Sequence, residues 1–131
     1  TSKSVVLSLT LGHHDRLIRF DSYFLGRAVD NLLRNGFTYA DKRIHIYLDQ
    51  TSDACRICIE NDGKPIPQED KKRLFDPFVR LDDSRDKDSG GTGLGLTIVA
   101  QIVKAHHGKV WVEDSELGGA KFVIQIASCM E

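Results

Sequence analysis

The sequence predicts an α+β fold: a two-layer sandwich in which three helices cover one face of a mixed, mainly antiparallel β-sheet. Segments that alternate apolar and polar residues occur towards both ends of the chain, and they are typical of strands with one buried face. Two longer segments instead repeat apolar residues at helical spacing. The order is strand, strand, helix, strand, strand, helix, loop, helix, strand, strand, which favours helices stacked on a single sheet.

The N-terminal half predicts four strands and one long helix. Residues 4–11 predict a half-buried strand, and residues 16–20 predict a short second one. A helix is expected from the capping residues before position 23 to about Tyr39. Its apolar stripe is formed by Leu25, Ala28, Val29, Leu32 and Leu33. The segments 43–49 and 55–61 are expected to pair as a hairpin. On the first strand, the apolar face consists of Val5, Leu7, Leu9 and Leu11.

The C-terminal half predicts two helices followed by two strands. A short helix is expected over 68–75, directly after a proline. A longer one is expected from about 93 to 107, and Gly108 suits the left-handed position that ends a helix. The strands are expected at 109–114 and 121–127. Between the two helices the chain is rich in charge and glycine, which predicts a long surface loop.

Composition restricts the class of protein. The chain has 131 residues, the size of one domain, with 40% apolar and 28% charged residues. A net charge of −1 gives no reason to expect binding to nucleic acid or to an anionic membrane. No apolar run is long enough to span a membrane and no signal-peptide pattern is present, so a soluble domain is expected. The start at Thr1, without Met, is consistent with a piece of a larger protein.

Two of the three cysteines form a C-x-x-C pair, Cys55 and Cys58. This spacing can indicate a metal or redox site. In a strand, however, residues three apart point to opposite faces, so the two thiols should not converge. There is no second pair to complete a zinc site, since only Cys129 remains. We therefore predict buried cysteines of an intracellular protein.

A glycine-rich stretch leads into the third helix. Gly90, Gly91, Gly93 and Gly95 precede its apolar residues, and backbone N–H groups at a helix N-terminus favour an anion. The spacing is not that of a dinucleotide-binding fingerprint, and Leu96 follows where a P-loop would have Lys. From the residues alone, a phosphate-binding loop and a flexible linker both remain open.

Three asparagines are candidates for a binding site. Asn31 and Asn35 lie one helical turn apart at the margin of the apolar stripe. They suit either ordinary hydrogen bonds to a loop or a Mg²⁺ ion that carries phosphate oxygens. Asn61 ends a strand and is followed by Gly63, which suits either recognition of a planar base edge or a plain turn.

Five motifs in order resemble the catalytic ATP-binding domain of bacterial sensor histidine kinases, which has the Bergerat or GHKL fold. They read NLLRNGFTY, NDGKPI, LFDPFVRLDDS, GGTGLGLTIV and ELGGAKF, and they look like the family's N box, first G box, F box, second G box and third G box. The resemblance covers nearly the whole chain. The stretch from the F box to the third G box is most similar to RstB-type sensors of proteobacteria.

The resemblance implies one catalytic domain over residues 1–131, with a lid at about 79–93. It implies ATP and Mg²⁺ as cofactors, Asn35 as the metal ligand, Asn31 beside the phosphates and Arg80 as a phosphate contact, these three being the catalytic residues. The implied nucleotide-binding residues are Asn31, Asn35, Tyr39, Asn61, Gly63, Ile66, Phe75, Phe78, Arg80, Gly91, Thr92, Gly93, Leu94, Gly95, Leu96 and Gly119.

Three positions depart from the family pattern. Asn61 replaces the Asp that accepts from the adenine amino group; its Oδ1 can still accept, without the charge-assisted part of the bond. Pro65 replaces a glycine, and Thr38 replaces a Lys or Arg that contacts phosphate. An alternative reading is therefore a degraded nucleotide-sensing or docking module of the same fold. A serine kinase of the anti-sigma type is a further alternative, although the long charged lid favours the histidine kinase.

The implied reaction is transfer of the ATP γ-phosphoryl group to a histidine on a separate dimerisation domain. None of the five histidines of this chain has the context of such an acceptor, so the domain should not phosphorylate itself. The implied partners are that dimerisation domain and a response regulator, with no nucleic acid and no direct membrane contact. The domain alone should be a monomer in the cytoplasm, and the parent a homodimer in the inner membrane.

Overall fold

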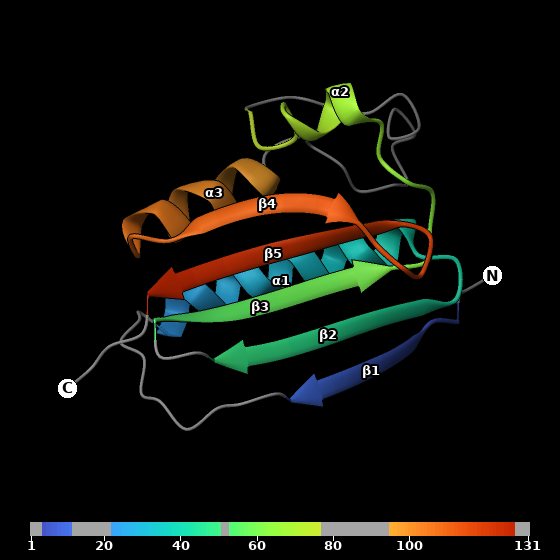
Figure 1. The fold of residues 1–131 in the computed structure, drawn as a ribbon, viewed down its shortest axis with the longest axis horizontal. Helices are drawn as coiled ribbons and strands as arrows, with labels where there is room; N and C mark the ends of the chain where they lie inside the picture. The colour runs from blue at the N-terminus through green and yellow to red at the C-terminus, as the bar shows by residue number, and fades with distance from the viewer. Residues whose placement is uncertain (1–3, 12–21, 51–52, 77–94, 128–131) are drawn as a thin grey trace.

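The computed structural model describes residues 4–11, 22–50, 53–76 and 95–127, and they form a five-stranded sheet with three helices packed against it (Figure 1). The strands are β1 (Val6–Leu11), β2 (Arg43–Gln50), β3 (Ala54–Asn61), β4 (Lys109–Asp114) and β5 (Ala120–Ala127). Their order across the sheet is β1-β2-β3-β5-β4. β1 and β2 are parallel and all other pairs are antiparallel, so the predicted mixed, mainly antiparallel sheet is confirmed.

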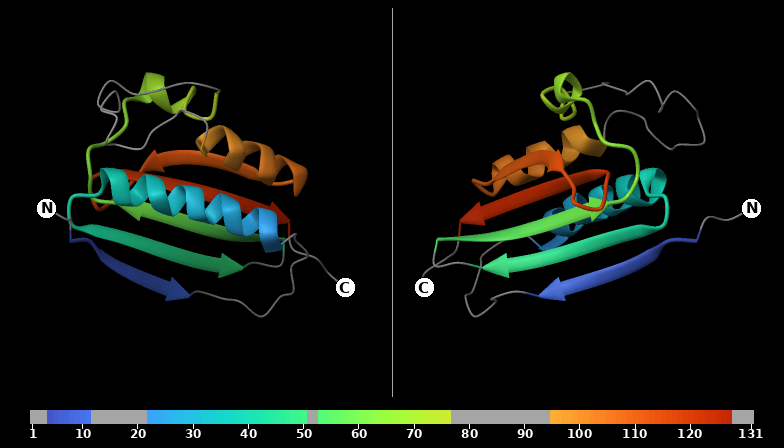
Figure 2. Two further views of the ribbon diagram at one scale, coloured as in Figure 1. Left: turned by 180° about the vertical axis from the view of Figure 1, so that it is seen from behind. Right: turned by 45° about the vertical axis from the view of Figure 1, so that its right-hand side comes forward.

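The helices are α1 (Ser22–Tyr39), α2 (Gln68–Lys71) and α3 (Gly95–Ala105). α1 and α3 lie against the same face of the sheet, as the view from behind in Figure 2 shows. That face, called the helix face below, buries Ile44, Ile59 and Ile124, each at most 1% exposed. The helices cover them with fully or nearly fully buried side chains, namely Ala28, Leu32, Val99 and Val103. The apolar periodicity that predicted α1 and α3 thus marks the faces that form the core.

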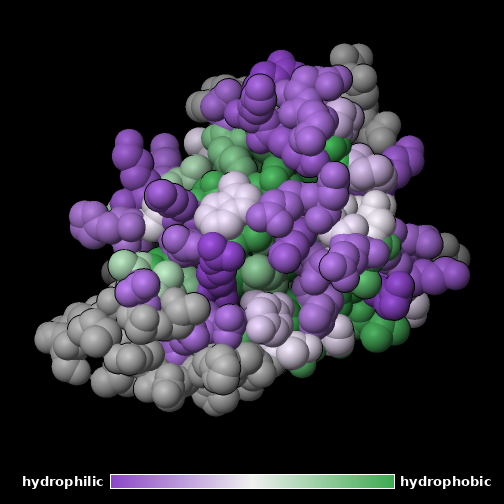
Figure 3. All heavy atoms as spheres, in the orientation of Figure 1, coloured by the Kyte–Doolittle hydropathy of each residue, from purple (hydrophilic) through white to green (hydrophobic). Residues whose placement is uncertain are grey.

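The opposite face of the sheet, the open face, is turned towards the viewer in Figure 3 and is largely hydrophilic. Alternation along β3 sends Cys55 to the helix face and Cys58 to the open face, so the prediction that the two thiols do not converge is confirmed. Both are free and buried, and burial raises the pKa of each thiol. Within the described ranges, no three His, Cys, Asp or Glu side chains are grouped so as to hold a metal ion.

Strand β1 is less buried than its alternating sequence predicts. Leu7 and Leu9 point to the helix face but remain 49% and 61% exposed. β1 is an edge strand whose only neighbour in the described sheet is β2, and the core cluster is built on the strands further in. The strand predicted over 16–20 lies outside the described residues.

Two helix ends differ from the predictions. α2 begins after Pro67 as expected but forms a single turn, and turns follow it up to residue 76. At the end of α3, the left-handed residue is His107, with φ 59°, and not Gly108. The N–H of His107 donates to Lys104 and that of Gly108 to Val103, both at 2.9 Å, which is a Schellman motif shifted by one residue. Gly108 is required by close packing instead, since a Cβ there would lie 2.4 Å from the carbonyl oxygen of Gln125.

None of the described helices is both long and apolar enough to cross a membrane.

Candidate functional site

The turn after β3 holds a buried polar side chain at the end of the helix face. Asn61 is the last residue of β3, only 2% exposed, and it follows Ile57 and Ile59 on that face. The N–H of Gly63 donates to Asn61 Oδ1 at 2.8 Å. The N–H of Gly119 donates to the backbone carbonyl of Asn61 at 3.1 Å. Asn61 is therefore fixed both by its own turn and by the turn that leads into β5.

The glycines around Asn61 have no room for a side chain. A Cβ on Gly63 would lie 2.0 Å from the carbonyl oxygen of Tyr39, and one on Gly119 would lie 2.3 Å from Asn61 Oδ1. The end of α1, the end of β3 and the start of β5 therefore meet at backbone contact distance. This close approach is a packing reason for glycine at both positions, separate from any role towards a ligand.

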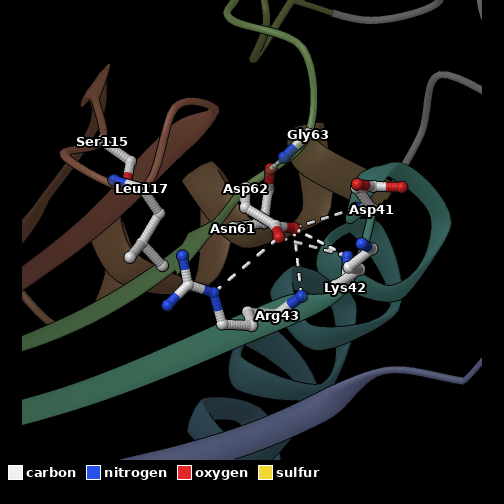
Figure 4. Close-up of polar contacts among 8 residues, drawn as sticks. All are labelled: Asp41, Lys42, Arg43, Asn61, Asp62, Gly63, Ser115 and Leu117. Carbon is white, nitrogen blue, oxygen red and sulfur yellow. Dashed lines mark hydrogen bonds and ion pairs between the residues drawn. The ribbon is translucent and has the colours of Figure 1, made fainter.

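Asp62, which the sequence reasoning did not single out, joins this turn to the end of α1. Its carboxylate accepts from the backbone N–H groups of Asp41, Lys42 and Arg43 at 2.9 to 3.0 Å, as Figure 4 shows. Hydrogen bonds from Arg43, and then Lys42, lower the pKa of Asp62. The only signal in the sequence was an acidic residue in a turn, which does not indicate which N–H groups it will meet.

The two amides of α1 lie on the flank that faces the other long helix. Asn31 Oδ1 would be 3.8 Å from a Cβ placed on Gly95, the first residue of α3. Asn31 thus lies beside the first turn of α3, where backbone N–H groups lack helical partners. Asn35 is one turn further along the same flank of α1 and is likewise partly buried. Neither side-chain amide makes a hydrogen bond within the described part of the chain.

The segment before the expected lid is attached to the same end of α3. Thr97 Oγ1 donates to the carbonyl of Phe75 at 3.1 Å, and the Phe75 ring packs edge-on against Phe122 at 6.3 Å. Ile66 and Leu96 pack against the core from either side of the expected lid. These contacts fix the described segments that precede and follow the predicted lid.

Six of the predicted site residues lie outside the described residues, as does the expected lid: they are Phe78, Arg80, Gly91, Thr92, Gly93 and Leu94. Two groups are found among the described ones. Asn61, Gly63, Gly119 and the backbone of Tyr39 meet at the end of β3, whereas Asn31 lies near Gly95. Thr38, one of the departures, donates its hydroxyl to the carbonyl of Arg34 at 2.9 Å, within its own helix.

Comparison with known proteins identifies the class. Residues 20–128 match the family described as histidine kinase-, DNA gyrase B-, and HSP90-like ATPase, and the chain belongs to this family of ATP-binding domains. Within the family, the chain is the catalytic domain of a sensor histidine kinase, as the similar sequences and structures in the next paragraph indicate.

The sensor histidine kinase CpxA of Escherichia coli K12 is 41% identical over 100 residues, covering 76% of this chain and 22% of CpxA. The sensor protein RstB of the same strain is 40% identical over 117 residues, covering 89% of this chain and 26% of RstB. The chain therefore spans about a quarter of these relatives. The nucleotide-free catalytic domain of histidine kinase ThkA has a TM-score of 0.80 and 28% identity, covering 94% of this chain and 80% of that one. The mycobacterial kinase MprB gives 0.81 and 27%, covering 95% and 86%.

Proposed function

We propose that this domain binds Mg²⁺-ATP and transfers the γ-phosphoryl group to a histidine on a separate dimerisation domain of the same parent protein. The observation that carries the proposal is the position of Asn31, whose amide lies beside the N-terminus of α3 without a hydrogen-bond partner in the described chain. The first N–H groups of a helix, with its dipole, bind phosphate, and an amide oxygen beside them is a ligand for a hard cation.

The donor set fits Mg²⁺. Asn31 and Asn35 offer neutral oxygens, which suit a cation whose charge is largely matched by triphosphate oxygens. Bound Mg²⁺ supplies charge neutralisation on the phosphates. The chain itself supplies position: Asn35 holds the metal, Asn31 and the first turn of α3 hold the phosphates, and Asn61 meets the base. Arg80 and the glycines before α3 complete the proposed site from the lid.

The proposed partners follow from the missing acceptor. The chain offers no histidine in an acceptor context, so the phosphoryl group passes to a dimerisation helix of the parent and then to a response regulator. A structure of ThkA in complex with the response regulator TrrA has a TM-score of 0.78 to this chain at 25% identity, covering 95% of this chain and 34% of that one. We propose that the parent is a membrane-bound homodimer with this domain in the cytoplasm.

The test is calorimetric titration of ATP into the 131-residue chain, with Mg²⁺ and with EDTA, for the wild type and Asn35→Ala. Removal of Mg²⁺ with EDTA and removal of its proposed ligand in Asn35→Ala should each weaken ATP binding by about tenfold or more, since each removes an interaction with a charged group. Arg34→Ala is the matched control, because Arg34 is the exposed neighbour that pairs with Asp30 and should leave the affinity unchanged. Binding that is equal with and without Mg²⁺ and in Asn35→Ala contradicts the metal role of Asn35.

One observation favours the second candidate, a nucleotide-sensing or docking module without kinase activity. Thr38 replaces the basic residue that would contact phosphate, and its hydroxyl donates to the carbonyl of Arg34 in its own helix. The titration separates the two candidates. Measurable Mg²⁺-dependent affinity supports the kinase, and no binding of ATP under any condition supports a module that acts by docking alone.

A further inference from the structure

Strand β4 forms one edge of the sheet, and no other described strand lies beyond it. The N–H of Ser115 donates to the carbonyl of Gly119 at 2.8 Å and closes the hairpin of β4 and β5. Because the backbone groups of successive residues point to alternate sides of a strand, this bond directs those of Trp111 towards β5. The N–H and carbonyl groups of Val110 and Val112 therefore point to the outer edge, where the described part of the chain offers them no partner.

A groove runs along this edge, between β4 and the single turn of α2, and is called the edge groove below. Figure 1 shows α2 beyond the edge of the sheet that β4 forms. The groove contains a cavity of about 610 Å³, within the range of roughly 300–1,000 Å³ that is typical of ligand sites. One side of the cavity is lined by Val110, Trp111 and Val112, and the other by Lys71, Lys72 and Phe75.

The charged side chains that line the edge groove are positive. Two lysines line it, and none of the described carboxylates does. Lys71 Nζ is bound to Asp114 Oδ1 at 2.6 Å, which ties α2 to the end of β4. Lys72 is exposed and has no ion-pair partner in the described part of the chain. Lys72 is therefore available to a negatively charged group on a ligand in the groove.

The shape of the edge groove favours a single strand as its occupant. Paired strands lie about 4.7–4.9 Å apart, and an added strand would bond to the outer groups of Val110 and Val112. A second copy of this chain would bring a whole sheet to the edge. The place of the next strand of that sheet is taken by α2, as the views in Figures 1 and 2 agree. An extended peptide meets no such obstacle, and its apolar side chains can pack beside Trp111.

We propose that the edge groove binds an extended acidic segment of a partner protein, which adds a strand to β4 and pairs a carboxylate with Lys72. Backbone hydrogen bonds to Val110 and Val112 supply the affinity, and Lys72 supplies the preference for acidic residues. The groove is separated from Asn61 on β3 by β5, and no nucleotide takes part in the contact. The inference therefore goes beyond the proposed function and stands or fails separately from it.

The test titrates short, end-blocked peptides into the full 131-residue chain. The first probe alternates Glu and Val, and the second has Lys in place of each Glu. Two further probes are the acidic peptide with N-methyl groups on all Val or on all Glu residues. Anisotropy of the labelled peptide measures binding, and the fluorescence of Trp111, the single tryptophan of the chain, locates it.

We expect the acidic peptide to bind about tenfold or more tightly than the basic one and to change the Trp111 fluorescence. N-methylation in one frame should weaken binding by about tenfold or more and in the other frame by little, because a strand bonds to an edge through alternate residues. Equal affinity for both methylated probes overturns the added strand. Binding that leaves Trp111 unchanged, or no binding up to about 1 mM, overturns the inference as a whole.

Charge reversal tests the role of Lys72. Lys72→Glu should reverse the preference, so that the basic peptide binds more tightly than the acidic one. Lys42→Glu is the matched control, because Lys42 is equally an exposed lysine but lies outside the edge groove, in the turn before β2. Circular dichroism confirms that both variants fold. The same preference in Lys72→Glu as in Lys42→Glu contradicts the proposed pairing with an acidic segment.

Discussion

Polar side chains are arranged differently on the two faces of the sheet. On the open face, Cys58 and Val123 are 5% and 2% exposed although none of the described helices covers them. Polar and aromatic side chains on neighbouring strands lie over this face, and Arg56 spans from a hydrogen bond with Gln125 at 2.7 Å to the ring of Trp111, 5.6 Å from its guanidinium carbon. On the helix face the cover is apolar, and the polar groups are confined to its margin.

The open face carries a chain of paired groups. Thr10 Oγ1 lies 2.8 Å from His45 Nε2, and His45 Nδ1 lies 3.3 Å from Glu60 Oε2. Ser115 then donates to Glu60 Oε1 at 2.6 Å. These groups satisfy one another across β1, β2, β3 and the turn before β5. On the helix side of the sheet, by contrast, the amides of Asn31 and Asn35 on α1 and the nitrogen of Asn61 have no hydrogen-bond partner in the described chain. Since none of the fully buried polar side-chain atoms described there lacks a partner, these groups keep contact with solvent.

The sharpest test of this comparison uses adjacent residues of β3. Ile59→Ala should cost about 2–5 kcal/mol of unfolding free energy, because Ile59 is 1% exposed in the core under α1. Cys58→Ala, on the open face, should cost about 1 kcal/mol, since it removes one heavy atom under a polar cover. Urea unfolding followed by circular dichroism measures both. Equal losses would mean that the two faces contribute alike to the core.

A second test substitutes Gly63 in the turn after β3, where the helix face ends and the candidate site begins. Gly63→Ala should cost about 1–3 kcal/mol or more, because its Cβ would lie 2.0 Å from the backbone oxygen of Tyr39, which cannot move independently. Gly26→Ala is the matched control. Nothing lies within 4 Å of a Cβ there, in the interior of α1, so about 0.5–1 kcal/mol should be gained. Thermal unfolding of both variants gives the comparison, and a neutral Gly63→Ala would contradict the close approach.

A smaller effect on stability is expected for Asp62, the residue after Asn61, which binds the backbone N–H groups of residues 41–43. Its pKa is lowered from 3.8 by backbone N–H groups that bind the charged form. A lowered folded pKa gives stability that is present above the unfolded pKa and lost as pH falls through the folded one. Asp62→Asn should therefore be less stable than the wild type at pH 7, and the difference should shrink as the pH falls below 3.8 and vanish only below the lowered pKa of the folded state. A difference that is constant with pH would show that the charge contributes nothing.

The smallest effect is expected from the two thiols of β3, which test whether each face of the sheet is closed to solvent: Cys55 lies on the helix face and Cys58 on the open face. Burial raises the pKa of Cys55 and Cys58, so little thiolate is present at neutral pH and access is poor. In a Cys129→Ser background, both should react with a disulfide reagent at pH 8 far more slowly in the folded chain than in denaturant. Rapid reaction of one thiol in the folded chain would identify a face that opens.

The sequence was sufficient to predict the elements in which a regular apolar pattern continues over many residues. The stripe of Leu25, Ala28 and Leu32 predicted α1, and alternation predicted β2 to β5. The sequence was insufficient where the spatial neighbours of a residue are contributed by a distant part of the chain. Gly108 was assigned to the left-handed position from its residue type, yet His107 takes it, and Gly108 instead packs against Gln125 of β5, where a Cβ has no room.

The same distinction applies to the candidate site. Alternation placed Asn61 on the helix face, and the helical repeat placed Asn31 and Asn35 on one flank. The direction of the Asn61 amide could not be predicted, since it depends on Gly63 and on Gly119 from a distant turn. The anchoring role of Asp62 depends in the same way on N–H groups at the end of α1.

The bond from Gly119 to Asn61 also has a consequence for the order of folding. β2 and β3 can pair early as a local hairpin, but Gly119 follows Asn61 only after α2 and α3. Closing so long a loop is slow relative to local pairing. A nascent or partly folded chain that lacks β5 therefore has the strand that carries Asn61 but not the contact with Gly119 that helps to fix its side chain, so this end of the sheet is completed only when β5 has paired.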